Sequence, residues 1–484
     1  MIALVIDVGS SSVRAMLFDE SLHALPDAAA TRKHSFKSDA PGESTTDVEM
    51  LRHLVEACID EILTHPAAGQ ISVVGMTSFV GSLVGVDAQG RPLMPMLTYM
   101  DSQCAADLAP LASQVDLGAI HQRTGCVHHT AYHPARLRWL KNTRPETVAQ
   151  AVRWLDVATY LYVHWFGDSP CSLSTAAWTG LLNRTTNTWD TEWLDLLEIS
   201  HTMLPEVVEY SETLAGLRPD YAARWPQLAR VPFCLAVGDG ATANLGSGAI
   251  DSSALALTIG TTTAMRIVTH GAPPPVPLGL WSYPIDQGRH LTGGAMSEGG
   301  NIPEWARSIL KLPTHDEVER MLLERTPDSH GLTFVPLLAG ERSPGWLPYA
   351  TGWIKGLRIT TSPLDILQAA LEGVALRLSL LASMLGHADA RIMAGGGALA
   401  HSPAWAQIVA NALGRNLYLL SETEVSARGT ALLAFEAISE FDARAHPPDV
   451  AHVVMFDPAA YEVLAGARER LAAFYQQQRE SMVL

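Results

Sequence analysis

The chain begins with Ile2-Ala-Leu-Val-Ile-Asp7-Val-Gly9-Ser10-Ser11-Ser12-Val-Arg14-Ala-Met-Leu-Phe18, two apolar runs of strand length separated by a small, hydroxyl-rich turn. This pattern predicts a β-hairpin with a polar tip. We expect Gly9 to supply the positive φ of a tight turn, and the amides and hydroxyls at the tip to converge on an anion. Asp7 adds a carboxylate, which suits a divalent cation held between it and a phosphate. A plain surface hairpin explains the stretch equally well.

A second copy of the pattern decides between these interpretations. Residues 254–268 read Ala-Leu-Ala-Leu-Thr258-Ile-Gly260-Thr261-Thr262-Thr263-Ala-Met-Arg-Ile-Val268, about half the chain away from the first copy. Two such hairpins, one in each half, indicate a duplicated fold that clamps a polyphosphate between its halves. This arrangement is similar to the phosphate clip of the actin/hexokinase-like ATPases.

Length and composition limit the class of protein. A chain of 484 residues is too long for one core and suits two domains of similar size. The net charge of −17, without a basic cluster, argues against a nucleic-acid partner. We expect no signal peptide, because Asp7 interrupts the apolar start, and no membrane-spanning stretch. The five cysteines are scattered, so a cytoplasmic protein is the default expectation.

The sharpest chemical signal is an acid between two glycines, in Gly238-Asp239-Gly240-Ala-Thr-Ala243-Asn244-Leu-Gly246. It follows the apolar run 233–237, so Asp239 lies at a strand end, exposed to an approaching substrate. The letters also match the dinucleotide pattern G-x-G-x-x-A, but no complete βαβ unit surrounds them. Acids between glycines also occur in plain turns. A G-x-x-x-x-G-K-[ST] motif is absent from the sequence, which excludes a Walker-type NTPase.

Other candidate site residues lie on either side of this turn. Tyr99 and Asp101 follow an apolar run and suit hydrogen bonds to a polyol, although a helix cap at Asp101 is an alternative. His129 and His133 have the spacing of a helical zinc pair, but Pro134 ends the pattern, so we expect a polar substrate contact instead of a metal.

Two glycine clusters and one long helix follow the second hairpin. The clusters are Glu298-Gly299-Gly300 and Gly395-Gly396-Gly397. Bare backbone there lets a flat base or a ribose lie close, and tight packing is the alternative. Ser362-Pro363 predicts the start of a helix with a buried stripe formed by Leu364, Leu367, Leu371, Val374 and Leu378.

Together these segments resemble the FGGY carbohydrate kinases over nearly the whole chain. The order and spacing of the motifs carry the resemblance: Asp7-x-Gly9-x-x-Ser12-x-Arg14, Tyr99-x-Asp101 where the family usually has Trp-x-Asp, Thr124-Gly125, Ser174-x-Ala176 with Thr179-Gly180-Leu181, Asp239-Gly240, Thr258-Ile-Gly260-Thr261-Thr262, Gly340-Glu341-Arg342-x-Pro344, Gly395-Gly396-Gly397, and Glu424-x-Ser426-Ala-x-Gly429. The wording around Asp239 and His129 is most similar to gluconate kinases.

The chain departs from the family pattern where substrate is recognised. The usual Met-His or Arg-Glu pair is Val80-Gly81, and the usual Arg after the acid is Gln103. In the adenosine region the common Ala-Asp is Ala410-Asn411. The departures therefore concern the substrate and not the reaction.

The resemblance implies an α/β protein of two actin-like (ribonuclease H-like) domains with a cleft between them. Residues 1–246 would hold the sugar, phosphate and catalytic base, and residues 247–484 the nucleotide. Asp239 would be the catalytic base, with ATP and Mg²⁺ as cofactors. Expected substrate contacts are Tyr99, Asp101, His129, Asp239 and Gly240. Expected ATP contacts are Gly9, Ser10, Ser11, Ser12, Arg14, Gly260, Thr261, Thr262, Gly299, Gly395, Gly396, Gly397 and Asn411. Asp7 would bind Mg²⁺ through water, with Asp239 as a second candidate ligand.

Three functions are compatible with these observations. The strongest is ATP-dependent phosphorylation of a small sugar, polyol or sugar acid, with gluconate as leading candidate and xylulose, ribulose or glycerol as others. The second is a non-catalytic sugar-binding or chaperone-like member of the same superfamily. The third, distant, is a nucleotide-cofactor oxidoreductase. A homodimer is one candidate assembly, which the sequence does not decide.

Overall fold

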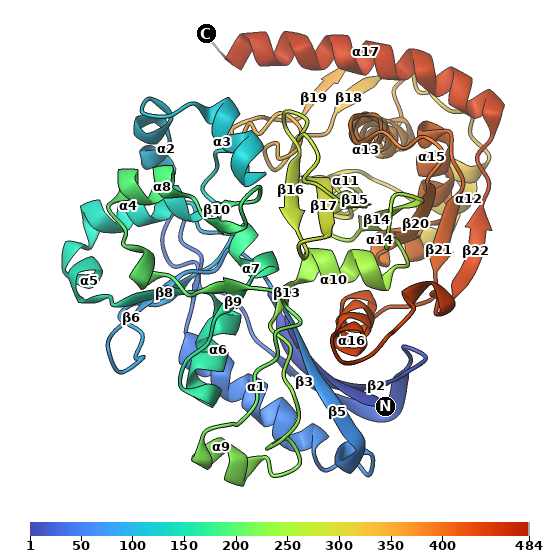
Figure 1. Ribbon diagram of the computed structural model, residues 1–484. Coiled ribbons are helices and arrows are strands. Elements are labelled where there is room, and N and C mark those ends of the chain that lie inside the picture. Colours follow the sequence, from blue (N-terminus) through green and yellow to red (C-terminus); the bar gives the residue numbers. More distant parts are fainter. Residues whose placement is uncertain (483–484) are drawn as a thin grey trace.

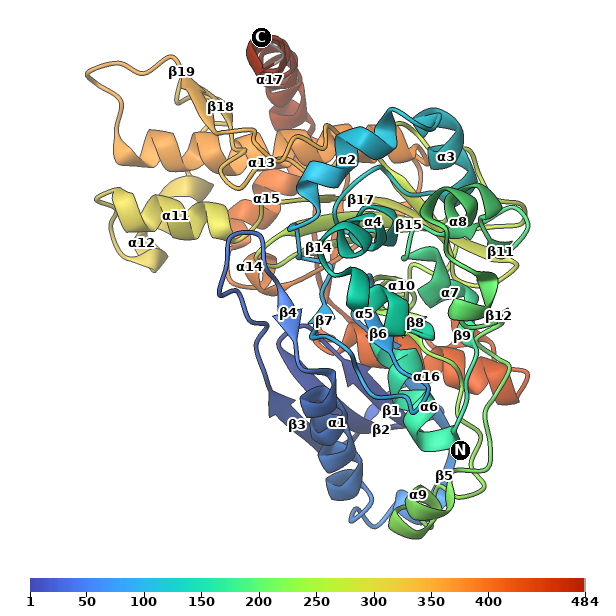
Figure 2. The same cartoon turned by 90° about the vertical axis from the view of Figure 1, so that its left-hand side faces the viewer.

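The computed structural model describes residues 1–482 and has two β-sheets with helices around them (Figure 1). The first sheet and helix α1 (Val48–Ile62) form the lower part of the view, and the second sheet and α13 (Pro363–Leu385) form the upper part. Figure 2, turned by 90°, shows the same division. The protein is thus a mixed α/β fold with two domains, as predicted.

The first sheet has five strands in the order β13-β5-β1-β2-β3. The hairpin predicted at the start of the chain forms its centre, with Asp7 opposite Arg14 in the antiparallel register. β5 pairs in parallel with β1, and β13 pairs in parallel with β5. The strands are β1 (Ile2–Val8), β2 (Ser12–Asp19), β3 (Ala24–Lys33), β5 (Ile71–Ser78) and β13 (Val237–Gly238).

The second sheet repeats this pairing pattern. Its order is β16-β17-β15-β14-β20-β21-β22, and β14-β15 is the second predicted hairpin. In both sheets three strands form an antiparallel meander and two more continue in parallel from its first strand. The strands are β14 (Ala254–Ile259), β15 (Thr263–His270), β16 (Trp281–Pro284), β17 (Arg289–Met296), β20 (Arg391–Gly395), β21 (Leu417–Leu420) and β22 (Val450–Val454). The structural repeat thus follows the sequence repeat.

Short elements complete each half. Five two-stranded sheets pair β4 (Thr45–Thr46) with β7 (Met96–Leu97), β6 (Val84–Val86) with β8 (Arg153–Leu155), β9 (Cys171–Ser172) with β12 (Val207–Val208), β10 (Leu182–Asn183) with β11 (Thr188–Trp189), and β18 (Thr333–Val335) with β19 (Trp353–Lys355). Further helices of the first half are α2 (Ala105–Ala112), α3 (Leu117–Thr124), α4 (His133–Thr143), α5 (Pro145–Gln150), α6 (Val157–Phe166), α7 (Leu173–Ala177), α8 (Thr191–Leu197), α9 (Pro219–Arg224) and α10 (Asp239–Gly246). Those of the second half are α11 (Asn301–Ile309), α12 (His315–Leu323), α14 (Gly397–Ala400), α15 (Pro403–Leu413), α16 (Val425–Ile438) and α17 (Pro458–Met482). Short 3₁₀ turns lie at Ala68–Gln70, His201–Met203 and Ala443–Ala445.

Helix α13 begins where Ser362-Pro363 predicted. The Ser362 side chain accepts the Asp365 N–H, and the predicted leucine and valine stripe is buried. α13 is also long and apolar enough to cross a membrane, contrary to our expectation of no such stretch. However, 72% of its most apolar 18-residue window is buried inside the protein, as is usual for a core helix.

The two halves meet where α10 crosses α16. An added Cβ at Gly429 of α16 would overlap the backbone oxygen of Thr242, and one at Gly246 would overlap that of Val425. Beside the crossing, Arg428 Nη1 donates to the Gly246 oxygen at 2.9 Å. α16 packs against β1 and β5, so a helix from the second half of the sequence completes the core of the first sheet. The domain boundary proposed at residues 246–247 thus divides the sequence but not this core.

We expect Gly429→Ala to destabilise the protein by more than the roughly 1–3 kcal/mol typical of overpacking, because the obstacle is backbone and cannot rotate away. Thermal unfolding measures the effect. Gly69→Ala is the matched control, since nothing lies within 4 Å of the added Cβ. Equal Tm values for the two variants would contradict the close crossing.

Candidate active site

The tips of the two hairpins have related backbone geometry. The Gly9 N–H donates to the Ser12 oxygen at 2.9 Å, and the Gly260 N–H donates to the Thr262 oxygen at 3.0 Å. Gly9 does not have a positive φ, so that part of our prediction is wrong. Its small size matters instead, because an added Cβ would lie 3.0 Å from the Ser12 oxygen. At Gly260 an added Cβ meets nothing within 4 Å, so this tip borders open space.

Both predicted glycine clusters pack around the second hairpin. The Gly300 N–H donates to the Gly260 oxygen at 2.7 Å, and an added Cβ on Gly299 would lie 2.7 Å from the Thr261 oxygen. Gly396 has a φ of 103°, and a side chain there would overlap the Ile259 backbone. The hairpin and both clusters therefore form one closely packed region of backbone, in which Gly299 is buried and Gly396 and Gly397 are exposed.

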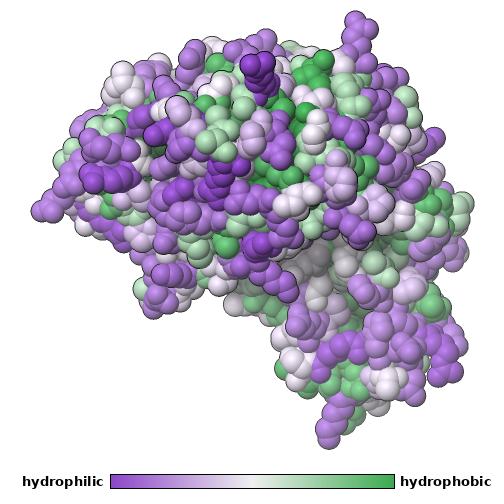
Figure 3. Space-filling view, turned by 90° about the horizontal axis from the view of Figure 1, so that it is seen from below, coloured by the Kyte–Doolittle hydropathy of each residue, from purple (hydrophilic) through white to green (hydrophobic). Residues whose placement is uncertain are grey.

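A cavity of about 280 Å³ adjoins this region. Gly300, Ala398 and Trp405 are in its wall, together with Arg307 and Glu319. Its volume approaches the range of small-molecule and cofactor sites. In space-filling view the molecule is hollowed between its main body and a smaller projecting lobe (Figure 3).

Three carboxylates influence one another at the first hairpin. Burial raises the pKa of Asp7 to about 7, against the effect of Arg14, and the negative charges of Asp239 and Glu424 contribute to the rise. Arg14, predicted to contact ATP, forms an ion pair with Glu424 just before α16. A bound cation would relieve this concentration of negative charge, so the residues present fit a divalent metal ion.

Asp239 is the first residue of α10, directly after β13, as its sequence context predicted. Its Oδ1 accepts the Gly240 N–H at 2.7 Å, and burial raises the pKa of its carboxyl. The Trp178 ring lies over the turn, 3.4 Å from the Cβ position of Gly240. Asp239 thus combines a fixed backbone position with an environment that favours holding a proton.

Tyr99 and His129 lie beside the same acids. Tyr99 is half-buried; burial and the negative charge of Asp239 raise the pKa of its hydroxyl, and a hydrogen bond with Ser10 lowers it. Burial lowers the pKa of His129 to about 4, helped by the positive charge of Arg342. His129 Nδ1 accepts the Ala131 N–H, which leaves Nε2 as the donor of a neutral ring.

Asp101 and Asn411 form hydrogen bonds within the protein. Asp101 is fully buried, and its oxygens accept hydrogen bonds from the Ser44 and Gln103 N–H groups and the Gln103 side-chain amide. Asn411 lies about 12 Å along α15 from its first residue, and its Oδ1 accepts the Asp457 N–H at the start of α17. Substrate contact by Asp101 and ATP contact by Asn411 remain predictions that these positions do not favour.

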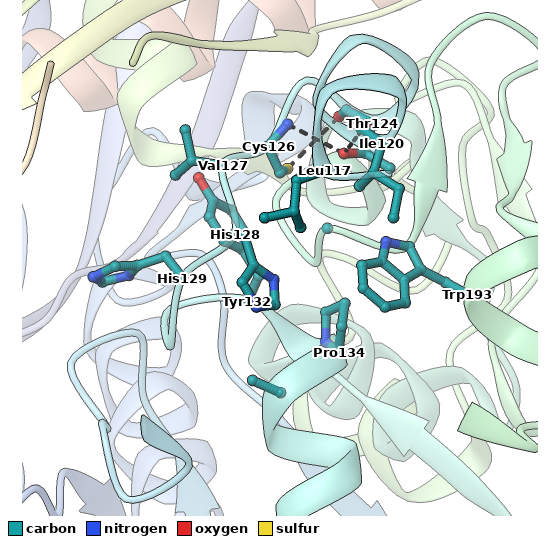
Figure 4. Close-up of a pocket in the computed structure, with 12 residues that line it drawn as sticks. Leu117, Ile120, Thr124, Cys126, Val127, His128, His129, Tyr132, Pro134 and Trp193 are labelled. Carbon is teal, nitrogen blue, oxygen red and sulfur yellow. Dashed lines mark hydrogen bonds between the residues drawn. The ribbon is translucent and has the colours of Figure 1, made fainter. Parts of the chain in front are cut away.

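A small cavity beside α3 and α4 is separate from these acids. Its volume of about 20 Å³ holds roughly one water molecule, so it does not fit a sugar. Figure 4 shows that the His129 ring at its edge points away from the other lining residues. That ring instead packs against Trp346 of the second half, with centroids 5.0 Å apart.

Sequence reasoning missed four residues at the site, namely Trp178, Arg266, Glu298 and Arg342. Glu298 and Arg342 were noted only as parts of motifs. Arg266 extends from β15 until its Nε lies 3.6 Å from the Cβ position of Gly240. Glu298 is 1% exposed, and both of its carboxylate oxygens are buried without a hydrogen-bond partner. These residues come from segments far apart in the sequence, and only the folded structure brings them to one site.

A different cluster has the composition of a metal site but is explained by hydrogen bonds. Asp328, His330 and Glu372 have ligand atoms within 4.8 Å of one another. His330 Nδ1 accepts the Leu332 N–H at 2.9 Å, so Nε2 carries the proton and donates to Glu372 at 3.0 Å. That nitrogen has no lone pair free for a metal.

A hairpin repeated in the two halves, with a half-buried acid at a strand end beside the first, is the arrangement expected of a carbohydrate kinase with an actin-like fold. Comparison with known proteins identifies the family. Models of the N-terminal and C-terminal domains of the FGGY family of carbohydrate kinases match residues 2–246 and 250–438. The chain belongs to this family of enzymes.

Known relatives are similar over most of their length. Gluconokinase of Bacillus subtilis is 26% identical over 455 residues, which cover 90% of this chain and 88% of the relative. Xylulose kinase of Escherichia coli is 26% identical, covering 89% and 88%. The crystal structure of gluconate kinase from Lactobacillus acidophilus superposes with a TM-score of 0.90 at 24% identity, covering 99% of this chain and 98% of that one.

We expect Glu298→Gln to stabilise the unliganded protein at pH 8 but not at pH 4. Burial raises the pKa of Glu298 from 4.5 to about 7, so the stability it contributes is present below pH 4.5 and is lost as the pH rises through 7. Two to three pKa units correspond to roughly 3 kcal/mol. Thermal unfolding from pH 4 to 8 measures the difference, and a pH-independent difference in Tm would contradict it.

Proposed function

We propose that this protein transfers the γ-phosphoryl group of ATP to a hydroxyl of a small sugar, polyol or sugar acid. The observation that carries the proposal is the position of Asp239 near both hairpins: it acts electrostatically on Asp7 of β1, and Arg266 of β15 acts on it. Gluconate is the leading substrate, in keeping with the gluconokinase similarity. Xylulose is the next candidate, and ribulose and glycerol types follow. The kinase relatives favour this function over the non-catalytic alternative.

The backbone of the two hairpins would bind the phosphates. Serine and threonine hydroxyls and exposed amides at the tips suit an anion, and the open space at Gly260 lets it approach. The adjoining 280 Å³ cavity would hold the nucleoside. When bound, Mg²⁺ would offset the negative charge of the phosphates, with Asp7 as its proposed partner and Asp239 as the second candidate.

Asp239 is the proposed catalytic base. Phosphoryl transfer to an alcohol needs an oriented hydroxyl and an acceptor for its proton as the new O–P bond forms. Burial raises the pKa of Asp239, which makes its carboxylate a better proton acceptor than an exposed one. Tyr99 and the Nε2–H of His129 would orient the other hydroxyls. The cytoplasmic location, the homodimer and the absence of a nucleic-acid partner remain predictions.

Asp239→Asn should lower kcat by roughly 10²- to 10⁴-fold while MgADP binds normally, because the variant removes the proton acceptor and keeps the shape of the turn. A coupled ADP-release assay across polyols, ketoses and sugar acids measures it. Asp101→Asn should instead change KM and Tm, since its partners are Ser44 and Gln103. A kcat for Asp239→Asn within a few-fold of wild type would refute the assignment.

Gly260→Ala should weaken MgADP binding at unchanged Tm. The added methyl group meets no protein atom within 4 Å, so it intrudes only on whatever occupies the space at the tip. Isothermal titration calorimetry on Gly260→Ala and on the Gly69→Ala control compares the two. Unchanged nucleotide affinity in Gly260→Ala would place the phosphates elsewhere.

A further inference from the structure

Arg266 reaches from the second half into the turn that holds Asp239. It lies on β15 opposite Gly293 of β17, and an added Cβ at Gly293 would lie 2.9 Å from the Arg266 Cγ. The glycine therefore leaves a path for the arginine stem across the sheet. At its other end the Arg266 Nε lies 3.6 Å from the Cβ position of Gly240. The guanidinium is thus placed at the predicted sugar position.

Arg266 is half-buried, and part of its guanidinium lacks the usual compensation. Arg266 Nε has no hydrogen-bond partner. Among residues 1–482, neither Arg266 nor Arg342 has a carboxylate oxygen within the 4.0 Å of an ion pair. Burial lowers the pKa of Arg266, the negative charge of Asp239 raises it, and the positive charge of Arg342 lowers it. Arg266 therefore faces Asp239 without an ion pair, and the positive charge of Arg342 lies near Arg266.

A second unpartnered donor borders the same gap. The Trp178 Nε1 is buried without a hydrogen-bond partner and lies 2.8 Å from the Cβ position of Gly238. The Val80 side chain, also 2.8 Å from that position, contributes only apolar surface. The unpaired donors of Trp178 and Arg266 and the positive charges of the two arginines would be compensated by an anionic acceptor. A neutral polyol would leave the two charges uncompensated.

We propose that Arg266 and Arg342 form a carboxylate-binding subsite that selects sugar acids over the corresponding neutral polyols. The inference rests on the proposed kinase function and specifies its substrate class. The carboxylate of an aldonate would lie at the two arginines, and one of its hydroxyls would face Asp239. A planar guanidinium binds a carboxylate through paired hydrogen bonds, which gives specificity as well as affinity.

The test compares D-gluconate with D-glucitol, which has an alcohol in place of the carboxylate. Calorimetric titration without nucleotide separates sugar-acid binding from phosphate binding. Wild type should bind gluconate at least tenfold tighter than glucitol. Arg266→Met should lower gluconate affinity by roughly 10- to 100-fold, leave glucitol affinity unchanged and retain MgADP affinity. Arg342→Met should act in the same direction, and Arg266→Lys should keep part of the preference.

Equal affinity of wild type for gluconate and glucitol would overturn the subsite. So would an Arg266→Met variant that loses MgADP affinity and keeps gluconate affinity, because the arginine would then serve the phosphates. MgADP binding also shows whether each variant is folded. If Arg266→Met does not fold, Arg266→Lys is used for the same comparison of gluconate and glucitol affinity. Phosphorylation of neutral ketoses without a preference for acids would refute the subsite and leave the kinase standing. Gluconate binding without ATP-dependent phosphorylation of any sugar would refute the kinase and leave the subsite standing.

Discussion

The crossing of α10 and α16 sets the geometry on which the active site depends. At Gly246 and Gly429 the two helices approach until no Cβ fits between their backbones. α10 begins at Asp239, and α16 follows Glu424, the partner of Arg14 on the first hairpin. Each helix therefore links the crossing to one acid of the cleft. A shift at the crossing would move the proposed base relative to the phosphate tip.

Charge in the cleft is arranged in two groups of opposite sign. Asp7, Asp239 and Glu424 make the electrostatic potential at the first hairpin negative, and Arg14 is the cation beside them. Arg266 and Arg342 form the positive group, on segments of the second half. Because both groups are at least partly removed from water, each favours a ligand of opposite sign. A metal-bound polyphosphate and an anionic sugar would compensate both.

The sequence predicted what depends on local pattern. Both hairpins, the strand end before Asp239 and the cap at Ser362 follow from alternation, glycine spacing and capping rules, and all are present. The membership of α16 in the first core was not predictable, because its apolar stripe does not say which sheet it covers. We expected the turn to need Gly9 because of a positive φ, but it needs the small size of glycine. Only the contact with the Ser12 oxygen reveals this difference. Arg266 and Glu298 lie within quoted motifs, but nothing in the spacing of those motifs marked them as site residues.

The backbone of the first half limits which side chains this half can offer to a substrate. Gly81 has a φ of 69°, and an added Cβ would lie 3.1 Å from the Ala131 oxygen and 3.3 Å from the Tyr99 Cβ. The backbone at Gly81 therefore has no room for a side chain. The substrate contacts proposed for this half, from Tyr99, His129 and Asp239, include no fixed positive charge. The proposed discrimination between acidic and neutral sugars therefore rests on Arg266 and Arg342 of the opposite half.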